Sequence, residues 1–539
     1  MPSMRTWIAA LPYVLAALAC GKGEPSALET AEAVAPVASV PKVADAPAAV
    51  SANPAALEAS APAASGGAPP VLDGPRIYSK RRHVWIHYQA STSSGWAGFL
   101  GLGSSVRLRG TEPRVGDGCA AFYPIEPRGW VCLNERTTLD PADPEYVAVL
   151  YFAPKLDGQY PHHYGESRGT PRYRTIPTRE EQHHREAGLD EHLANLEKLR
   201  AGTMSPEDAP PGLHGVDPKP ANAGPPDELF RIGRVQEERD YIKSLSTIAW
   251  SHEFDAEGRT WLVTADVMLV PKDRVSPYPT TDFKGVELRG DVKLPIVFVR
   301  YAPKIKYRRT SDGGVESTGE FWPRLSHVGL TGETVSAGGK TYLVTKDEDR
   351  LIDEADATVL KSSLATPWGE IVDGVAEDEA RKAAVQRVPA PEGGRRTWVE
   401  VSVLSGWLIA YEGTKPVYAT LIAPGRGGVP RRGIDPLKDA ATPTGTFRID
   451  GKFSTATMAN PAFVHSDVPY AQNFHGPHAL HMAYWHDGWG ERKSAGCINL
   501  SPADARWFFH WTEPLIPEGW FGIRSDKEAG PATTVIVHN

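Results

Sequence analysis

The sequence predicts a mainly β multidomain protein. Short runs of alternating apolar and polar residues recur from about residue 76 onward, separated by Gly and Pro turn signals, and helical patterns are few. The chain has 539 residues, which suffices for about three or four domains of ordinary size. Hydrophobic residues make up 41% and charged residues 23%, as in a soluble globular protein.

The charge balance argues against a nucleic-acid partner. The formal net charge is −8, and basic and acidic residues are mixed along the chain. A nucleic-acid-binding protein needs a basic face that neutralises phosphates. We therefore predict no nucleic-acid binding.

Residues 1–19 have the pattern of an export signal. Arg5 supplies a positive charge, and the apolar run Trp7 to Leu18 has signal-peptide length. Leu18-Ala19-Cys20 resembles a lipobox. Cys20 would then be lipid-modified and would anchor the protein to a membrane. The predicted location is the cell envelope or periplasm. In the alternative interpretation, Cys20 is an ordinary residue removed with the signal.

Residues 20–75 are predicted to be a disordered tether. Ala, Pro, Val, Ser and Glu dominate them, and aromatic residues are almost absent. Such a segment buries too little apolar surface to fold.

Residues 76–140 are predicted to form a small β-barrel. Gly95-Trp96-Ala97-Gly98 and Gly129-Trp130-Val131 resemble bacterial SH3-like domains, which would make wall binding a function of this region. The alternative is an unrelated barrel whose tryptophans fill the core. Cys119 and Cys132 lie close together here and are plausible disulfide partners in an oxidising compartment.

The middle of the chain carries no motif with recognisable chemistry. Residues 141–228 are predicted to be a helix, over about Thr178 to Ala201, followed by a Pro- and Gly-rich connection. Residues 229–388 contain several strand patterns and are predicted to form a strand-rich region of one or two domains.

A further domain is predicted at residues 397–539. Its first strands, Trp398–Val403, Trp407–Tyr411 and Val417–Ile422, should form an antiparallel meander, and Thr533–Val537 a late strand.

Cys497 remains without a partner, and a lone cysteine in an exported protein suggests catalysis. Ser501 is a good N-cap and Pro502 a good first helical residue, so a short helix should follow the cysteine. Helix amides directed at the sulfur would favour a thiolate, and Gly496 permits close backbone approach. A nucleophilic cysteine also needs a base. The number of positions that separate the base from Cys497 does not distinguish among four upstream histidines: His475, His478, His481 and His486.

The surroundings of Cys497 resemble the catalytic signature of the L,D-transpeptidase (YkuD-type) family. His481 precedes Cys497 by sixteen positions, a spacing common in that family. The similar segments are Leu480-His481-Met482-Ala483-Tyr484-Trp485-His486-Asp487-Gly488-Trp489-Gly490, Ser494-Ala495-Gly496-Cys497-Ile498-Asn499-Leu500 and Thr442-Pro443-Thr444-Gly445-Thr446-Phe447.

The resemblance implies a YkuD-like β-sandwich or barrel that acts on peptidoglycan stem peptides without a cofactor. Cys497 would form a thioester after His481 takes its proton. The other residues singled out are Gly496 for the oxyanion, Ser494 and Asn499 for the turn, and Tyr484 and Trp485 for the donor cleft. Two positions depart from the family pattern: Ala495 replaces the usual histidine, and Met482 the glycine after the catalytic histidine.

Other functions remain open at this stage. A hydrolase of the same fold would act as an L,D-carboxypeptidase, with water instead of an amine resolving the thioester. An inactive protein would be a peptidoglycan-binding tether of the envelope. Zinc could bind His475, His478 and His481 at their three-residue steps. Because the family explains His481 without metal, and Gly476 and Pro477 oppose a helical presentation, we predict no metal site.

Overall fold

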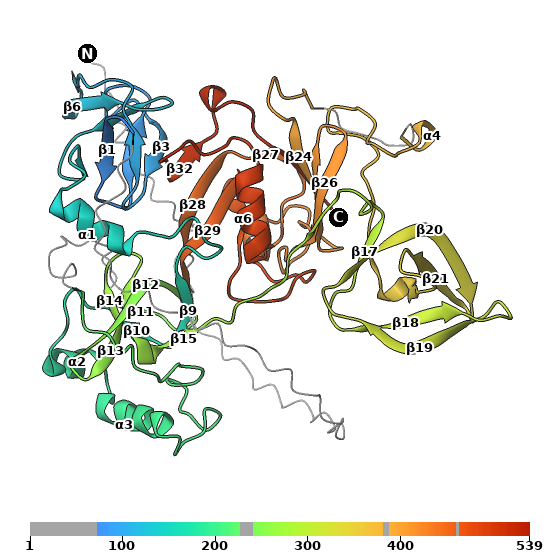
Figure 1. The fold of residues 1–539 in the computed structure, drawn as a ribbon, viewed down its shortest axis with the longest axis horizontal. Helices are drawn as coiled ribbons and strands as arrows, with labels where there is room; N and C mark the ends of the chain where they lie inside the picture. Colours follow the sequence, from blue (N-terminus) through green and yellow to red (C-terminus); the bar gives the residue numbers. More distant parts are fainter. Residues whose placement is uncertain (1–72, 227–240, 381–387, 460–462) are drawn as a thin grey trace, which may run out of the picture. The chain divides into compact units, whose positions relative to one another are not determined.

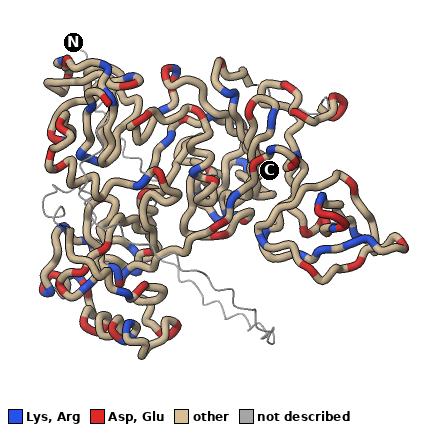
Figure 2. Tube along the Cα trace, in the orientation of Figure 1, with Lys and Arg blue, Asp and Glu red and all other residues tan. Residues whose placement is uncertain are grey.

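The structure is a computed structural model that describes residues 73–226, 241–380, 388–459 and 463–539. The predicted signal, Cys20 and the tether up to residue 72 lie outside these ranges. Among the helices described, none combines the length and the apolar character that crossing a bilayer requires. Basic and acidic residues are interspersed along the described chain (Figure 2).

Strands dominate every region, which confirms the mainly β prediction (Figure 1). Residues 73–140 form one small sheet, in the order β4-β1-β8, and contribute β3, β2, β7, β6 and β5, in that order, to a 15-stranded sheet that continues into the residues after 396. Their bounds are β1 (Arg76–Ser79), β2 (Val84–His87), β3 (Trp96–Leu100), β4 (Ser105–Arg107), β5 (Arg114–Gly116), β6 (Cys119–Pro124), β7 (Trp130–Cys132) and β8 (Thr137–Thr138).

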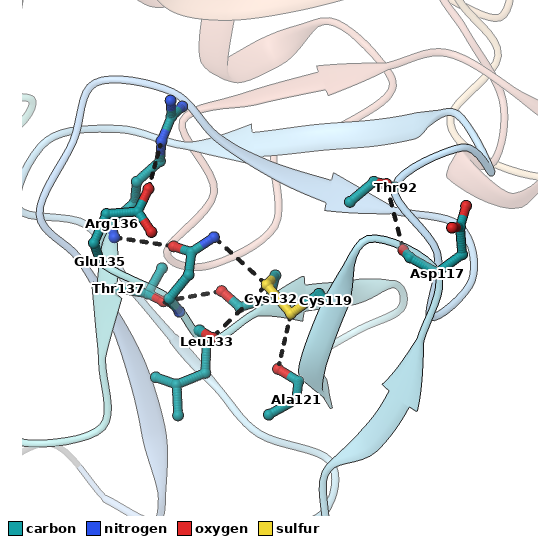
Figure 3. The surroundings of a disulfide bond; sticks show 10 residues. Thr92, Asp117, Cys119, Ala121, Cys132, Leu133, Glu135, Arg136 and Thr137 are labelled. Carbon is teal, nitrogen blue, oxygen red and sulfur yellow. Dashed lines mark hydrogen bonds and ion pairs between the residues drawn. A yellow bond between two sulfur atoms is a disulfide. The ribbon is translucent and has the colours of Figure 1, made fainter.

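The core of this region is largely aliphatic and includes Ile77, Ile86 and Val131. Trp96 and Trp130 are only half-buried, so these tryptophans do not fill the core. A disulfide joins Cys119 to Cys132, with the two Cα atoms 6.0 Å apart (Figure 3). It links the start of β6 to the end of β7, and closing a loop of this size contributes about 2–4 kcal/mol of stability.

Two helices, instead of one, occupy the predicted helical segment. Thr178 caps α2 in a capping box with Glu181, and α3 begins after Gly188, whose φ of 69° interrupts the helical path. Strand β9 pairs with β12 and β15, so one sheet crosses the boundary suggested at residue 228. The elements are α1 (Pro144–Phe152), β9 (His163–Ser167), β10 (Thr170–Pro171), α2 (Arg179–Arg185), α3 (Leu189–Arg200), β11 (Tyr241–Ile242), β12 (Thr247–Ala256), β13 (Arg259–Thr264), β14 (Leu269–Pro271) and β15 (Val275–Pro277).

A separate sheet, which we call the inserted sheet, follows in the order β19-β18-β22-β21-β20-β17-β23. Val297, Val299, Leu330 and Ile352 lie in its core. Its strands are β17 (Ile296–Phe298), β18 (Lys304–Arg309), β19 (Val315–Trp322), β20 (His327–Ala337), β21 (Lys340–Thr345), β22 (Leu351–Asp353) and β23 (Thr358–Leu360). It is flanked by β16 (Val286–Glu287), which pairs with β26, and by α4 (Glu377–Ala380).

The residues after 396 contribute to two sheets. One has the order β16-β26-β25-β24-β33-β27, and the other contains β29, β28 and β32, with β30 beside β29 and β31 beside β30. As predicted, β24, β25 and β26 form an antiparallel meander. The elements are β24 (Thr397–Ser402), β25 (Trp407–Glu412), β26 (Lys415–Leu421), α5 (Pro436–Asp439), β27 (Gly445–Arg448), β28 (Gly451–Ala459), β29 (Val464–His475), β30 (His478–Met482), β31 (Ile498–Leu500), α6 (Pro502–Trp511), β32 (Gly522–Arg524) and β33 (Thr534–His538).

Helix α6 packs against β29 and β30 (Figure 1). Ser501 caps it as predicted, accepting a hydrogen bond from the Asp504 N–H at 3.2 Å. The buried Asp504 carboxylate accepts hydrogen bonds from the hydroxyls of Tyr418 (2.7 Å) and Thr420 (2.6 Å) on β26. The start of the helix is thereby fixed to the opposite sheet.

A buried lysine satisfies the other end of α6. Lys452 on β28 is fully buried, and its Nζ donates to the carbonyls of Phe509 (2.6 Å) and Thr512 (2.8 Å). The last carbonyls of a helix lack intrahelical partners, so these bonds replace a conventional cap. Burial lowers the pKa of Lys452 to about 7.

We expect Lys452→Met to lower the free energy of unfolding by about 2–4 kcal/mol, because two buried carbonyls lose their donor. Urea denaturation measures this, and Lys415→Met, at an exposed position on β26, is the matched control. Equal stability of the two variants would contradict the capping role.

Candidate active site

Cys497 and His481 come from neighbouring chain segments. Strands β30 and β31 are parallel, with His481 opposite Asn499 and Leu480 opposite Ile498. Because side chains alternate along a strand, the two faces of this pair differ. Leu480, Met482, Ile498 and Leu500 belong to the hydrophobic core. His481 and Asn499 therefore project to the other face.

The Cys497 thiol lies beside the start of β30. Its sulfur is 3.9 Å from the Pro477 carbonyl oxygen, and the Ala479 N–H donates toward it. Ala479 and His481 are two residues apart on one strand and project to the same face, at a rise of about 6.6 Å. The predicted nucleophile thus lies beside the start of the strand that carries the predicted base.

Burial dominates the electrostatics of the thiol. The side chain is partly open to solvent, yet burial raises the pKa of Cys497 to about 11, and the Ala479 N–H offsets only part of that effect. The expectation that helix amides would favour a thiolate is wrong here. Helix α6 begins at Pro502, and its Asp504 amide is occupied by Ser501. The resting residue is a neutral thiol.

His481 is held in a defined tautomer. Its side chain is 2% exposed, and Nδ1 lies 2.7 Å from the Met482 carbonyl oxygen. A carbonyl only accepts, so Nδ1 carries the hydrogen and Nε2 the lone pair. Burial lowers the pKa of His481 to about 4, which keeps the ring neutral and able to accept a proton at neutral pH.

The turn before Cys497 is held by Ser494. The Ser494 hydroxyl donates to the Cys497 carbonyl at 2.6 Å and accepts from the Gly496 N–H at 3.0 Å. Gly496 has a φ of 127°, and a Cβ there would lie 2.9 Å from both the Ala441 oxygen and His478 Nε2. Only glycine fits. Because its N–H is occupied, the Cys497 N–H becomes the expected oxyanion donor.

Asn499 is oriented by a histidine from the loop that follows β30. Its side-chain amide meets Nε2 of His486 at 3.1 Å. The atom in contact is the amide nitrogen Nδ2, which donates to the lone pair of Nε2 when the ring is neutral. The Gly488 N–H lies 3.3 Å from Nδ1 of the same ring.

The two predicted cleft residues differ in position. Tyr484 is 4% exposed, and its hydroxyl donates to the Ser466 carbonyl at 2.9 Å. Trp485 is half-buried and lies between His465, which it stacks on at 4.2 Å, and the ring of His481 at 5.9 Å. Trp485 thus borders the catalytic face, whereas Tyr484 lines a separate cavity.

The departures from the family pattern lie where they disturb little. Ala495 is exposed, and Met482 points into the core between the sheets. His475 and His478 have ring centroids 6.1 Å apart, but His478 and His481 project to opposite faces of β30. Among the residues described, no group of three or more His, Cys, Asp or Glu side chains is arranged to hold a metal ion.

Comparison with known families identifies the domain that carries these residues. Residues 396–537 match the L,D-transpeptidase catalytic domain family, YkuD. No curated protein sequence matches the chain. We refer to residues 396–537 as the YkuD domain.

Several solved structures similar to the chain are described as L,D-transpeptidases. The protein from Stackebrandtia nassauensis is 23% identical over 30% of this chain and 65% of its own, with a TM-score of 0.19. An Enterococcus faecium L,D-transpeptidase is 19% identical over 29% and 52%, with a TM-score of 0.20. One from Mycobacterium tuberculosis is 16% identical over 42% and 72%, with a TM-score of 0.19. This chain thus spans less than two thirds of the first two structures.

Residues outside the YkuD domain hold the loop that follows β30, residues 483–493, which we call the catalytic loop because of its place in the candidate site. Arg324, between β19 and β20, pairs with the Asp487 carboxylate at 2.9 Å and also donates to its carbonyl. Thr281 donates to the same carboxylate at 2.8 Å. Arg300 donates to the Gly490 carbonyl at 2.9 Å. The inserted sheet and its flanking residues therefore position the loop that carries Trp485 and His486.

Sequence reasoning did not assign roles to several residues that adjoin the site. His465, Arg300 and Arg324 come from distant segments and carry no local signal. Thr442 had a signal in its motif, and the structure shows its use: its Oγ1 accepts from the Gly425 N–H at 2.8 Å beside the turn. His478, singled out only by its spacing, lies against Gly496.

We expect Arg324→Gln to increase hydrogen exchange at the amides of residues 486–490 about tenfold, because losing a charged hydrogen bond costs roughly 1.5 kcal/mol. Mass-detected exchange measures this. Arg308→Gln, which breaks an exposed ion pair with Glu316 in the same inserted sheet, is the control. Equal protection in both variants would argue against the positioning role.

Proposed function

We propose that this protein is an L,D-transpeptidase that acts on peptidoglycan stem peptides through a Cys497 thioester, with His481 as general base. The observation that carries the proposal is the parallel register of β30 and β31, which turns the imidazole of His481, with its lone pair on Nε2, away from the core, while the Cys497 thiol lies beside the start of β30. The match of residues 396–537 to the YkuD family supports the reaction class.

The acylation step follows from the neutral state of both groups. As the Cys497 sulfur attacks the carbonyl carbon of an L,D-peptide bond, Nε2 of His481 accepts the thiol proton. The developing oxyanion accepts from the Cys497 N–H, and such a donor lowers the barrier by about 3–4 kcal/mol. The imidazolium then protonates the leaving amine as the C–N bond breaks, which leaves a thioester and neutral His481.

The second step reverses these proton movements. An amine of an acceptor stem attacks the thioester carbon and gives a proton to His481, and that proton returns to the sulfur as the C–S bond breaks. Water in place of the amine would give hydrolysis, the L,D-carboxypeptidase reaction. The half-buried Trp485 beside His481 reduces the space available to solvent and supports transfer over hydrolysis.

The proposal includes a location in the cell envelope. Residues 1–19 act as the export signal and Cys20 as the lipid attachment site. The Cys119–Cys132 disulfide supports an oxidising compartment, where such bonds persist.

We expect the purified protein to convert disaccharide-tetrapeptides into cross-linked dimers, detected by mass. Cys497→Ala should abolish formation of the dimers. His481→Asn should lower the rate of their formation about 10²–10⁴-fold, the usual contribution of a general base. His510→Asn, at an exposed histidine on α6, should match the unsubstituted protein.

Tripeptides without dimers would instead identify a carboxypeptidase. Identical traces for the unsubstituted protein and Cys497→Ala would refute the enzymatic proposal and favour an inactive envelope tether.

A second test uses the pH dependence of thiol reactivity. With the pKa of Cys497 near 11, about one thiol in 10⁴ is ionised at pH 7, so alkylation by iodoacetamide should rise steadily through pH 9–10. His481, whose pKa is about 4, is neutral throughout that range. His481→Asn should therefore leave the profile unchanged.

For turnover, kcat/KM should stay level above pH 5 and fall below about pH 4, where protonated His481 no longer accepts a proton. A plateau of rapid alkylation at neutral pH that His481→Asn removes would show a thiolate–imidazolium pair instead and contradict this mechanism.

A further inference from the structure

A cavity of about 340 Å³ lies beside the loop that follows β30. Residues near β9, β12 and β15 form most of its wall, and Tyr484 of the YkuD domain closes one side. The Tyr484 ring stacks on Tyr164 at 3.9 Å, and its hydroxyl contacts Thr247 at 2.7 Å. This side of the wall is held by several contacts. A volume of this size suits a small ligand.

The cavity offers aromatic surfaces that are partly open. Tyr160 and Tyr278 are half-buried, and Trp250, which is 8% exposed, stacks with His163 at 5.7 Å. Tyr278 also meets Tyr484 at 5.8 Å. Aromatic faces carry partial negative charge and attract polarised C–H groups, so they suit the flat apolar face of a pyranose ring.

The polar lining suits a sugar that carries an acidic substituent. Burial lowers the pKa of His162 and of His252 to about 4, so both rings are neutral, and Nδ1 of each has no hydrogen-bond partner among the described residues. Lys155, which is exposed, is the one lysine or arginine in the described lining. Because the described lining contains no Asp or Glu, it lacks the paired carboxylates of glycoside hydrolysis. The cavity therefore fits binding without cleavage.

We propose that this cavity binds an amino sugar of the peptidoglycan strand, with Lys155 meeting an acidic group on that sugar. The inference rests on the proposed function and deepens it, because it adds the glycan to the stem peptide as a recognised part of the substrate. Stacking on the half-buried Tyr160 and Tyr278 supplies the contact area, and the neutral histidines supply hydrogen-bonding groups.

The distance from the cavity to the catalytic pair agrees with the length of a stem peptide. The Tyr484 ring meets Trp485 at 4.9 Å, and Trp485 meets His481 at 5.9 Å. The cavity and the base are thus separated by two ring contacts. Three extended residues span at most about 10 Å. The wall of the cavity and the proposed base therefore lie within about the span of three extended residues, with the ring of Trp485 between them.

Binding to peptide-free glycan tests the proposal without depending on activity. The full chain carrying Cys497→Ala is titrated with oligosaccharides of alternating N-acetylglucosamine and N-acetylmuramic acid, and separately with uncharged N-acetylglucosamine oligosaccharides of equal length. Calorimetry should detect binding of both. Tyr278→Ala should weaken both about tenfold, whereas Lys155→Gln should weaken only the acidic glycan, about three- to fivefold.

Tyr307→Ala is the matched control, since this half-buried tyrosine pairs with Tyr342 in the inserted sheet, away from the cavity. No glycan binding, or equal affinities for Tyr278→Ala and Tyr307→Ala together with no effect of Lys155→Gln, would overturn the proposal. Lys155 is exposed, so its variant stays informative if Tyr278→Ala unfolds. Normal transpeptidation without glycan binding refutes the cavity proposal alone. Glycan binding without turnover refutes only the proposed function.

Discussion

The pairing of β30 with β31 is the constraint on which the rest of the site depends. One face of these strands packs into the core, and the other carries His481 and Asn499. A slip of one residue would exchange the faces and bury polar groups in the core. The hydrophobic contacts of Leu480, Met482 and Ile498 therefore fix the position of the base as firmly as any contact it makes itself.

Burial gives this pair its chemical character. The thiol and the imidazole both remain uncharged because the surrounding protein penalises either ion. In the proposed mechanism, the thiol proton must then move as the substrate carbonyl is attacked. The cost is a weak resting nucleophile, and the benefit is a cysteine protected from adventitious oxidation.

Local patterns in the sequence predicted the parts of the fold that depend on neighbours in the chain. The meander after residue 397 and the Ser501 cap follow from alternation and capping chemistry. The break at Gly188 was missed because a short helical pattern does not reveal a left-handed residue. The half-buried Trp96 shows that an aromatic residue in a strand does not by itself identify the core.

The residues of the candidate site that belong to a sequence motif were predictable. The residues that reach the site from outside the motif were not. Arg300 and Arg324 reach the catalytic loop from more than a hundred positions away, and no periodicity records such contacts. The state of the thiol also escaped prediction, since its pKa depends on how densely the folded chain surrounds the sulfur.

Strand β33 lies between β24, with which it runs parallel, and β27. It is the latest strand of the described chain, yet it occupies an interior place in its sheet. The sheet that holds the start of α6 through Asp504 therefore stays incomplete until nearly all of the YkuD domain has been synthesised. A nascent or truncated chain that lacks Thr534–His538 would contain the β30–β31 pair and still leave β24 and β27 without the strand that joins them.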